Sequence, residues 1–164
     1  MKRFIIFITL ALSSKACYCQ SSQIDLVNGK HITGISQTNI NGSWNCDQCD
    51  EMLKLFFNKS ESHVQKNGFN VYFESLIVTV KQFIYQGKNI KDKFGNPIEL
   101  IISANDKRTY EGRYKDPITG TNIILTIHYD DEQHLTLSYR MPEMDVRNDQ
   151  SKGTIFKKSY ILVK

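Results

Sequence analysis

The chain has 164 residues, enough for one domain but not for a second hydrophobic core beside it. Hydrophobic residues make up 40% and charged residues 23%, which is ordinary for a globular protein. The net charge of +4 comes largely from residues 1–19, which hold Lys2, Arg3 and Lys15 and no acid. Taking these three from the 21 basic residues leaves 18 against 17 acidic ones, a net charge of +1. A nearly neutral domain lacks the basic surface of nucleic-acid-binding proteins, so we expect no nucleic-acid partner.

The first 19 residues have the pattern of an export signal. Met1-Lys2-Arg3 is basic, Phe4 to Leu12 is a continuous apolar run, and small residues follow up to Ala16. The apolar run is too short to remain as a transmembrane helix. We therefore expect an exported protein, located in the periplasm, the cell envelope or the extracellular space.

Three kinds of processing fit this signal. Cleavage can follow Ala16, or it can follow Cys19 and leave Gln20 first; in the third alternative Cys17 is lipidated, which would attach the protein to a membrane. Residues 20–39 are polar and predict a flexible lead-in with room for one short strand. The folded domain is expected over residues 40–164.

Gly42-Ser43-Trp44 lies at the start of that domain. The glycine lets the chain bend into a first strand, and the only tryptophan fills one end of the core. Cys46 and Cys49 follow in a short loop. Two cysteines three positions apart in an oxidising compartment most simply form a local disulfide, whereas a structural zinc site needs a second pair of ligands.

The rest of the chain alternates between apolar and polar residues with the period of strands. Asn58 to Gly68 is polar and closes on Asn67-Gly68, a strong hairpin turn. Ser75 to Tyr85 is partly apolar on both faces, which also fits a short helix, but its β-branched residues favour a strand. The predicted strands are Leu53–Phe57, Phe69–Phe73, Ser75–Tyr85, Ile98–Ser103, Arg108–Tyr114, Ile123–Tyr129, Leu135–Met141 and Thr154–Val163.

About seven to nine short strands separated by turn residues predict an all-β domain, either an antiparallel up-and-down barrel or a β-sandwich. An immunoglobulin-type sandwich spaces a tryptophan between two cysteines of different sheets. Here Trp44 lies beside both cysteines. The barrel is therefore the preferred prediction.

Gly42-Ser43-Trp44, the strands that follow and the end Tyr160-Ile161-Leu162-Val163-Lys164 resemble the lipocalin-like group. More narrowly, the chain resembles an uncharacterised family of small secreted flavobacterial proteins with a signal peptide and an early Gly-x-Trp. The resemblance covers Ile40 to Lys164. In lipocalins a late arginine stacks on the tryptophan, and the final strand here offers Lys157 and Lys158 instead. The resemblance implies a closed antiparallel barrel able to hold a small apolar ligand, with no assigned activity.

The strand alternation places a set of large apolar side chains inside the barrel. Such an interior is either filled by its side chains or holds one small ligand, and this many large residues favour a filled or narrow one. The candidate cavity residues are Trp44, Leu55, Phe57, Leu125, Ile127, Leu137 and Tyr139.

The sequence carries no Gly-x-Ser-x-Gly, no His-Glu-x-x-His and no glycine-rich phosphate loop, so we expect neither enzymatic activity nor a cofactor. One pair of histidines could still hold a metal. A three-residue loop at Asp130–Glu132 would set His128 opposite His134 beside two acids, whereas a five-residue loop would separate them. Because surface histidines are common, we expect no metal there.

The sequence thus predicts an exported, non-enzymatic β-barrel. Its partner is either a small apolar molecule or, if the barrel is packed, another protein, which it would bind as an interaction module or inhibitor of the envelope.

Overall fold

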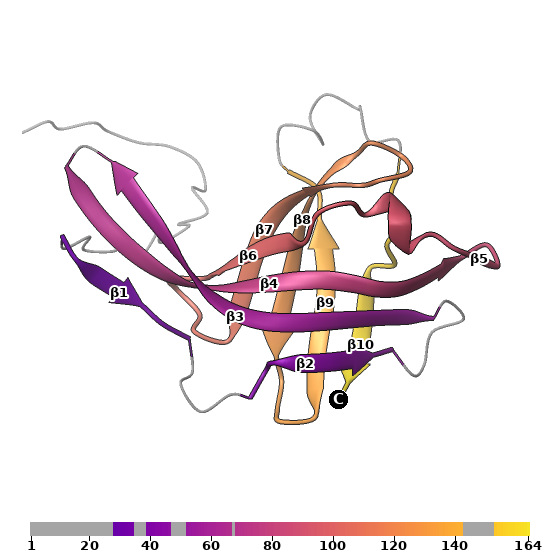
Figure 1. Ribbon diagram of the computed structural model, residues 1–164, viewed down its shortest axis with the longest axis horizontal. Coiled ribbons are helices and arrows are strands. Elements are labelled where there is room, and N and C mark those ends of the chain that lie inside the picture. The colour runs from indigo at the N-terminus through magenta and orange to yellow at the C-terminus, as the bar shows by residue number, and fades with distance from the viewer. Residues whose placement is uncertain (1–27, 35–38, 47–51, 67, 143–152) are drawn as a thin grey trace, which may run out of the picture.

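The computed structural model describes residues 28–34, 39–46, 52–66, 68–142 and 153–164. Within these ranges the chain forms ten strands and one short 3-10 helix (Figure 1). They are β1 (Lys30–Ile32), β2 (Gly42–Asn45), β3 (Leu53–Lys66), β4 (Phe69–Tyr85), β5 (Lys88–Asn89), the helix η1 (Lys91–Lys93), β6 (Ile98–Ile102), β7 (Thr109–Lys115), β8 (Asn122–Tyr129), β9 (His134–Arg140) and β10 (Ser159–Val163).

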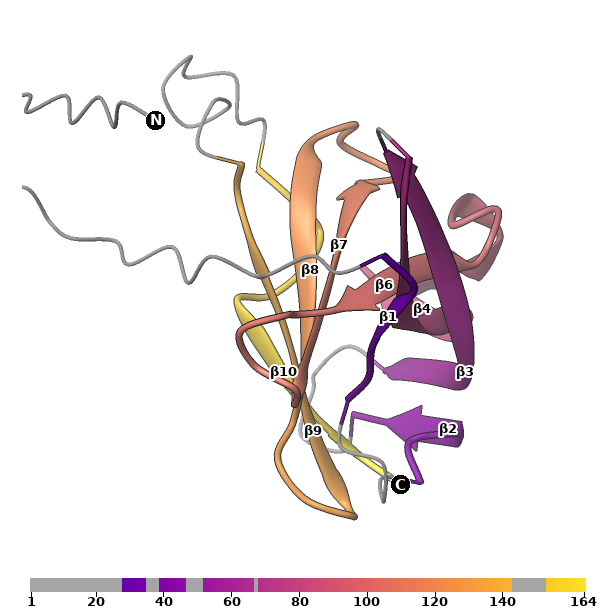
Figure 2. The ribbon, with the colours of Figure 1, turned by 90° about the vertical axis from the view of Figure 1, so that its left-hand side faces the viewer.

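Eight of these strands close into an antiparallel barrel. In the order β2, β3, β4, β6, β7, β8, β9, β10 each strand pairs with the next, and β10 returns to β2. The predicted up-and-down barrel is confirmed. Seen from the side, β7 to β10 form one wall and β2 to β4 lie across the other (Figure 2). No helix in the described part of the chain is long and apolar enough to cross a membrane.

Strands β3 and β4 are longer than the barrel they belong to. β2 pairs with β3 only over residues 54–57, and β6 pairs with β4 only over residues 75–78. The remainder, residues 58–66 of β3 and 69–74 of β4, extends beyond the barrel with β1 alongside (Figure 1). We call this part the ribbon.

Residues 58–66, which lay outside the predicted strands, continue β3 as far as Lys66. Both faces of the ribbon carry many polar side chains, so the period-2 signal of a half-buried strand is missing there. The predicted hairpin joins β3 to β4: Lys66 pairs with Phe69, and Gly68 has a φ of 82°, while Asn67 of the predicted turn lies outside the described residues. Residues 75–85 form a strand, as preferred over a helix.

The core fills the barrel from both ends. At one end, here the Trp44 end, the fully buried indole donates its Nε1–H to the carbonyl oxygen of Ile40 at 2.8 Å and lies 6.4 Å from the Phe57 ring. At the other, the Phe94 end, the rings of Phe83, Phe94 and Phe156 lie within 6.1 Å of one another. Gly42 has a φ of 119°, a conformation that favours glycine at the predicted bend into β2.

A lysine lies over the tryptophan, but neither of the two that the sequence suggested. The Nζ atom of Lys164 is 5.6 Å from the centre of the Trp44 ring and donates to the carbonyl oxygen of Asn39 at 2.6 Å. The expected strand over residues 154–163 is shorter than predicted and begins at Ser159. Val163 at the end of β10 pairs with Asn45, so the residue that follows it lies beside Trp44.

The buried carboxylate of Asp116 joins the β7–β8 turn to the segment before β10. Its Oδ1 atom accepts the backbone N–H groups of Ile118 and Thr119, both at 2.8 Å. Its Oδ2 atom accepts the hydroxyl of Thr154 at 2.7 Å and the N–H of Ile155 at 2.8 Å. Burial alone would raise the pKa of Asp116, but these four donors lower it below its ordinary value.

Asp116→Asn should destabilise the protein by at least about 2 kcal/mol, because the amide nitrogen faces N–H and O–H donors that the carboxylate accepts. Since folding lowers the pKa of Asp116, its ionised form contributes stability above the unfolded pKa, and this stability is lost as pH falls through the folded pKa. The difference between wild type and variant should therefore shrink toward low pH. Urea unfolding at several pH values measures it.

The matched control is Asp92→Asn, which changes an exposed acid in the first turn of η1. We expect it to change the free energy of unfolding by less than about 0.5 kcal/mol. Equal effects of the two substitutions would contradict a structural role for Asp116.

Candidate functional site

The interior residues predicted to line a cavity do face inward, but they do not surround one common space. Trp44 and Phe57 pack into the Trp44 end. Tyr139 is half-buried and packs against the core from its edge. The other four candidates, each 4% exposed or less, line a small void nearer the Phe94 end: Leu55, Leu125, Ile127 and Leu137.

This void measures about 20 Å³, and its lining is entirely apolar. On this measure a single water needs about 10–15 Å³ together with two to four polar partners, which the lining does not offer. Ligand pockets commonly measure about 300–1,000 Å³. The described side chains around this void therefore fill the space between them and leave no ligand-sized cavity there.

The roof of the void consists of two phenylalanines that lie outside the strands. Phe94 follows η1, and Phe156 lies in the segment before β10. Their rings meet edge to face with centres 6.1 Å apart, and both side chains are buried. Because no strand pairing holds these two residues, the roof is the part of the barrel wall that can move with the least loss of hydrogen bonds.

A polar cluster lies where the ribbon leaves the barrel. The carboxylate of Glu74 is 3.1 Å from the Lys59 ammonium, accepts the hydroxyl of buried Tyr110 and accepts the Gly34 N–H at 3.3 Å. Burial, and then the neighbouring Glu74 carboxylate, raise the pKa of Tyr110 well above its ordinary value. Glu74 occupies the same strand face as Leu76, so its inward position could have been recognised from the alternation along β4.

On the same face of the ribbon, three rings stack across three strands. His31 of β1, Tyr72 of β4 and His63 of β3 are register partners, with ring centres 4.5 Å apart on one side of the tyrosine and 4.7 Å on the other. His31 also contacts Glu61 at 3.0 Å, and His63 contacts Asn70 at 3.0 Å. The stack cross-links the ribbon, although sequence analysis selected none of these residues.

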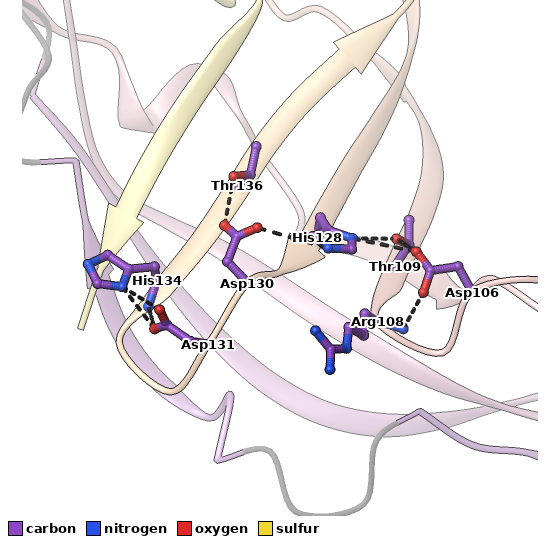
Figure 3. Close-up of polar contacts among 8 residues, drawn as sticks. All are labelled: Asp106, Arg108, Thr109, His128, Asp130, Asp131, His134 and Thr136. Atoms are coloured by element: carbon purple, nitrogen blue, oxygen red, sulfur yellow. Dashed lines mark hydrogen bonds and ion pairs between the residues drawn. The ribbon is translucent and has the colours of Figure 1, made fainter.

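The two histidines considered for a metal are not paired. His128 lies opposite Thr136 in the ladder, and its Nδ1 atom is 2.9 Å from the Thr109 hydroxyl and 3.5 Å from Asp106 (Figure 3). His134 instead contacts Asp131, at 2.8 Å. The register of the hairpin therefore separates the imidazoles that a three-residue loop at Asp130–Glu132 would have brought together.

The His128 cluster ties two loops together on the outside of the barrel. The Thr109 hydroxyl, and then the Arg108 backbone N–H, lower the pKa of Asp106. Asp130 lies 3.9 Å from the other side of the imidazole. These side chains are between a third and a half exposed, so the group lies on the open outer surface. Within the described ranges, no three His, Cys, Asp or Glu side chains are placed to hold a metal ion.

Cys46 is the one cysteine of the predicted bridge among the described residues. Cys46 is buried directly after β2, and its N–H donates to the carbonyl oxygen of Leu53 at 2.9 Å. Cys49 lies outside the described residues, as do the export signal, Cys17 and Cys19. The Cys46–Cys49 disulfide and the processing of the signal stay predictions.

Comparison of the chain with protein-family models, with curated proteins and with solved structures found no match. The resemblance to secreted lipocalin-like proteins therefore stays a prediction from the sequence.

Tyr110→Phe should destabilise the protein by about 1.5–3 kcal/mol, because the half-buried Glu74 carboxylate loses a hydroxyl donor while the ring stays in place. Urea unfolding measures this change. Tyr139→Phe, at a half-buried tyrosine of the same barrel, is the matched control and should change the free energy of unfolding by less than about 0.5 kcal/mol. Indistinguishable variants would show that the Glu74 cluster contributes nothing to stability.

Proposed function

We propose that this chain is an exported, non-enzymatic binding protein that acts through the outside of a packed barrel, with the ribbon as its binding surface for another polypeptide. The observation that carries the proposal is the filled interior. The interior void that the described residues line measures about 20 Å³, which is too small for a carried molecule.

The ribbon is the part of the molecule that supports a surface role. It extends past the barrel wall, and the barrel does not need it for closure, because the eight-strand pairing is complete without residues 58–66 of β3. It also exposes apolar surface at Val64, whose side chain is 44% exposed. Strands that present a free edge bind other polypeptides by adding a strand to the sheet.

One observation favours a second candidate function, the binding of a small apolar molecule. The void is lined only by apolar side chains, and its roof of Phe94 and Phe156 is not held by a strand ladder. If these two rings swing outward, the void beneath them widens into the interior of the barrel. An apolar ligand would then displace phenylalanine side chains rather than water.

Site-specific photo-cross-linking in the host tests the surface role. A photoreactive residue at Val64 should cross-link to a polypeptide in the envelope or the medium, because Val64 lies on the ribbon. The matched position is Ile118, which is 46% exposed but lies in the Asp116 turn, away from the ribbon. We expect cross-linked products from position 64 and none from position 118.

Equal products from both positions, or none from position 64, would contradict a binding role for the ribbon. The result does not depend on which polypeptide is captured, since the comparison is between two equally exposed positions on one folded chain.

Native and denaturing mass spectrometry of the protein isolated from its host separates the two candidate functions. For a packed barrel we expect equal masses, apart from covalent changes seen in both spectra. An excess of a few hundred daltons in the native spectrum would support the small-molecule role. In that case Phe94→Trp, which overfills the roof, should abolish retention, whereas Phe56→Trp on the outer face should not.

A further inference from the structure

Among the described strands, none covers one edge of β3 along the ribbon. β4 pairs with β3 along its whole length, from Leu53 to Lys66, and β2 covers the other edge only as far as Phe57. The other edge of the ribbon, formed by β4, is covered. β1 pairs with residues 71–73 of β4, and β6 pairs with residues 75–78 at the base of the ribbon. Residues 58–66 of β3 are therefore the exposed edge of the ribbon.

A hydrogen bond at Lys59 shows which backbone groups point out of this edge. The N–H of Lys59 donates to Asn41 Oδ1 at 2.8 Å, on the side away from β4. Backbone groups alternate along a strand, so those of Glu61, His63 and Gln65 also point away from β4.

The hydrogen bonds of β4 lead independently to the same outward-facing residues of β3. The N–H of Asn70 donates to Asn28 Oδ1 at 2.9 Å, and its carbonyl oxygen accepts the Gly29 N–H at 2.8 Å, so Asn70 faces β1. The next residue, Val71, must then face β3, where its register partner is Val64. Because Val64 faces β4, its neighbours His63 and Gln65 face outward.

We propose that this edge pairs with the same edge of a second copy of the chain, antiparallel and centred on Ser62, so that two ribbons form one continuous sheet. The inference rests on the proposed function, since it names the polypeptide that the ribbon binds. Such an interface has two-fold symmetry and uses the same surface on both copies.

The register follows from the side chains. An antiparallel pair must set outward-facing residues opposite each other, which leaves three central registers: Glu61 with Glu61, His63 with His63, or Glu61 with His63. The first sets like charges together, and the second does so whenever the imidazoles are protonated. The third pairs an acid with an imidazole twice, once on each side of the two-fold axis. It is the register centred on Ser62, and each Glu61–His63 pair exchanges two backbone hydrogen bonds.

The ribbon is also held in shape before a partner arrives. The His31–Tyr72–His63 stack joins β1, β4 and β3, and Asn41 fixes the base of the edge through Lys59. A pre-formed edge loses less conformational entropy on pairing than a mobile one.

Sedimentation equilibrium of the purified full chain over a range of concentrations tests the proposal, and we expect a monomer–dimer equilibrium. His63→Glu sets two carboxylates opposite each other in both central pairs and should weaken the dimer about tenfold. The double variant Glu61→Lys with His63→Glu restores opposite charges in the same register and should restore the dimer. His134→Glu makes the same change of charge at a half-exposed histidine away from the ribbon and should leave the equilibrium unchanged.

Hydrogen exchange supplies a second measurement that does not depend on variants. The amides of Glu61, His63 and Gln65 should become protected as the concentration rises, whereas that of Lys59 is already bonded to Asn41.

A chain that is monomeric at every concentration, a dimer that His63→Glu does not weaken, or a double variant that fails to recover would each overturn the proposal. Its failure can be told apart from that of the proposed function. Cross-linking from position 64 to a different polypeptide, with a monomeric purified chain, would refute self-pairing but keep the ribbon as the binding surface.

Discussion

The structure depends on closing the sheet between β2 and β10, and the backbone contributes little to that contact. The ladder there consists of one pair, Val163 with Asn45. The Lys164 side chain adds to the joining, since it lies over the Trp44 ring and donates to the carbonyl oxygen of Asn39. The buried Trp44 indole is itself held by its hydrogen bond to Ile40. A charged group over an indole face and a satisfied buried N–H stabilise the contact where strand pairing is shortest. The tryptophan thus links β2 to the residue that follows β10, where the sheet closes.

This closure has a consequence for the strand next to β2. Because β2 has only four residues, it can cover no more than the first part of β3, whose pairing with β4 continues to Lys66. The ribbon therefore arises from a mismatch of strand lengths rather than from a separate folding unit. The interior, in contrast to this uncovered strand edge, is closely packed, since its large side chains leave a void of about 20 Å³. Among the described residues, the barrel is packed within, and the backbone groups that lack a strand partner lie outside it, on the ribbon part of β3.

Sequence patterns predicted the strands that have one solvent-exposed face and one buried face. The alternation from Ile123 to Leu137 gave both strands and their buried sides, because burial imposes the period. The polar half of β3 was missed since both its faces carry polar groups. The Lys164–Trp44 contact, the Glu74 cluster and the place of Asp116 depend on which distant strands meet, and local spacing does not encode that. The separation of His128 from His134 depends on a loop register that the sequence leaves open in two ways.

A free strand edge is a hazard as well as a binding surface, and proteins commonly guard such edges with prolines, bulges, inward charges or covering loops. β3 is guarded at its base by Asn41, but beyond Lys59 the backbone groups of alternate residues point outward in a ribbon that three stacked rings hold in shape. Pairing with a second copy would satisfy those groups and remove the edge. Only the register centred on Ser62 sets Glu61 opposite His63, so the same side chains that allow self-pairing also disfavour slipped registers. Self-pairing would therefore account for how this barrel can keep a long strand edge without adding unrelated strands to it.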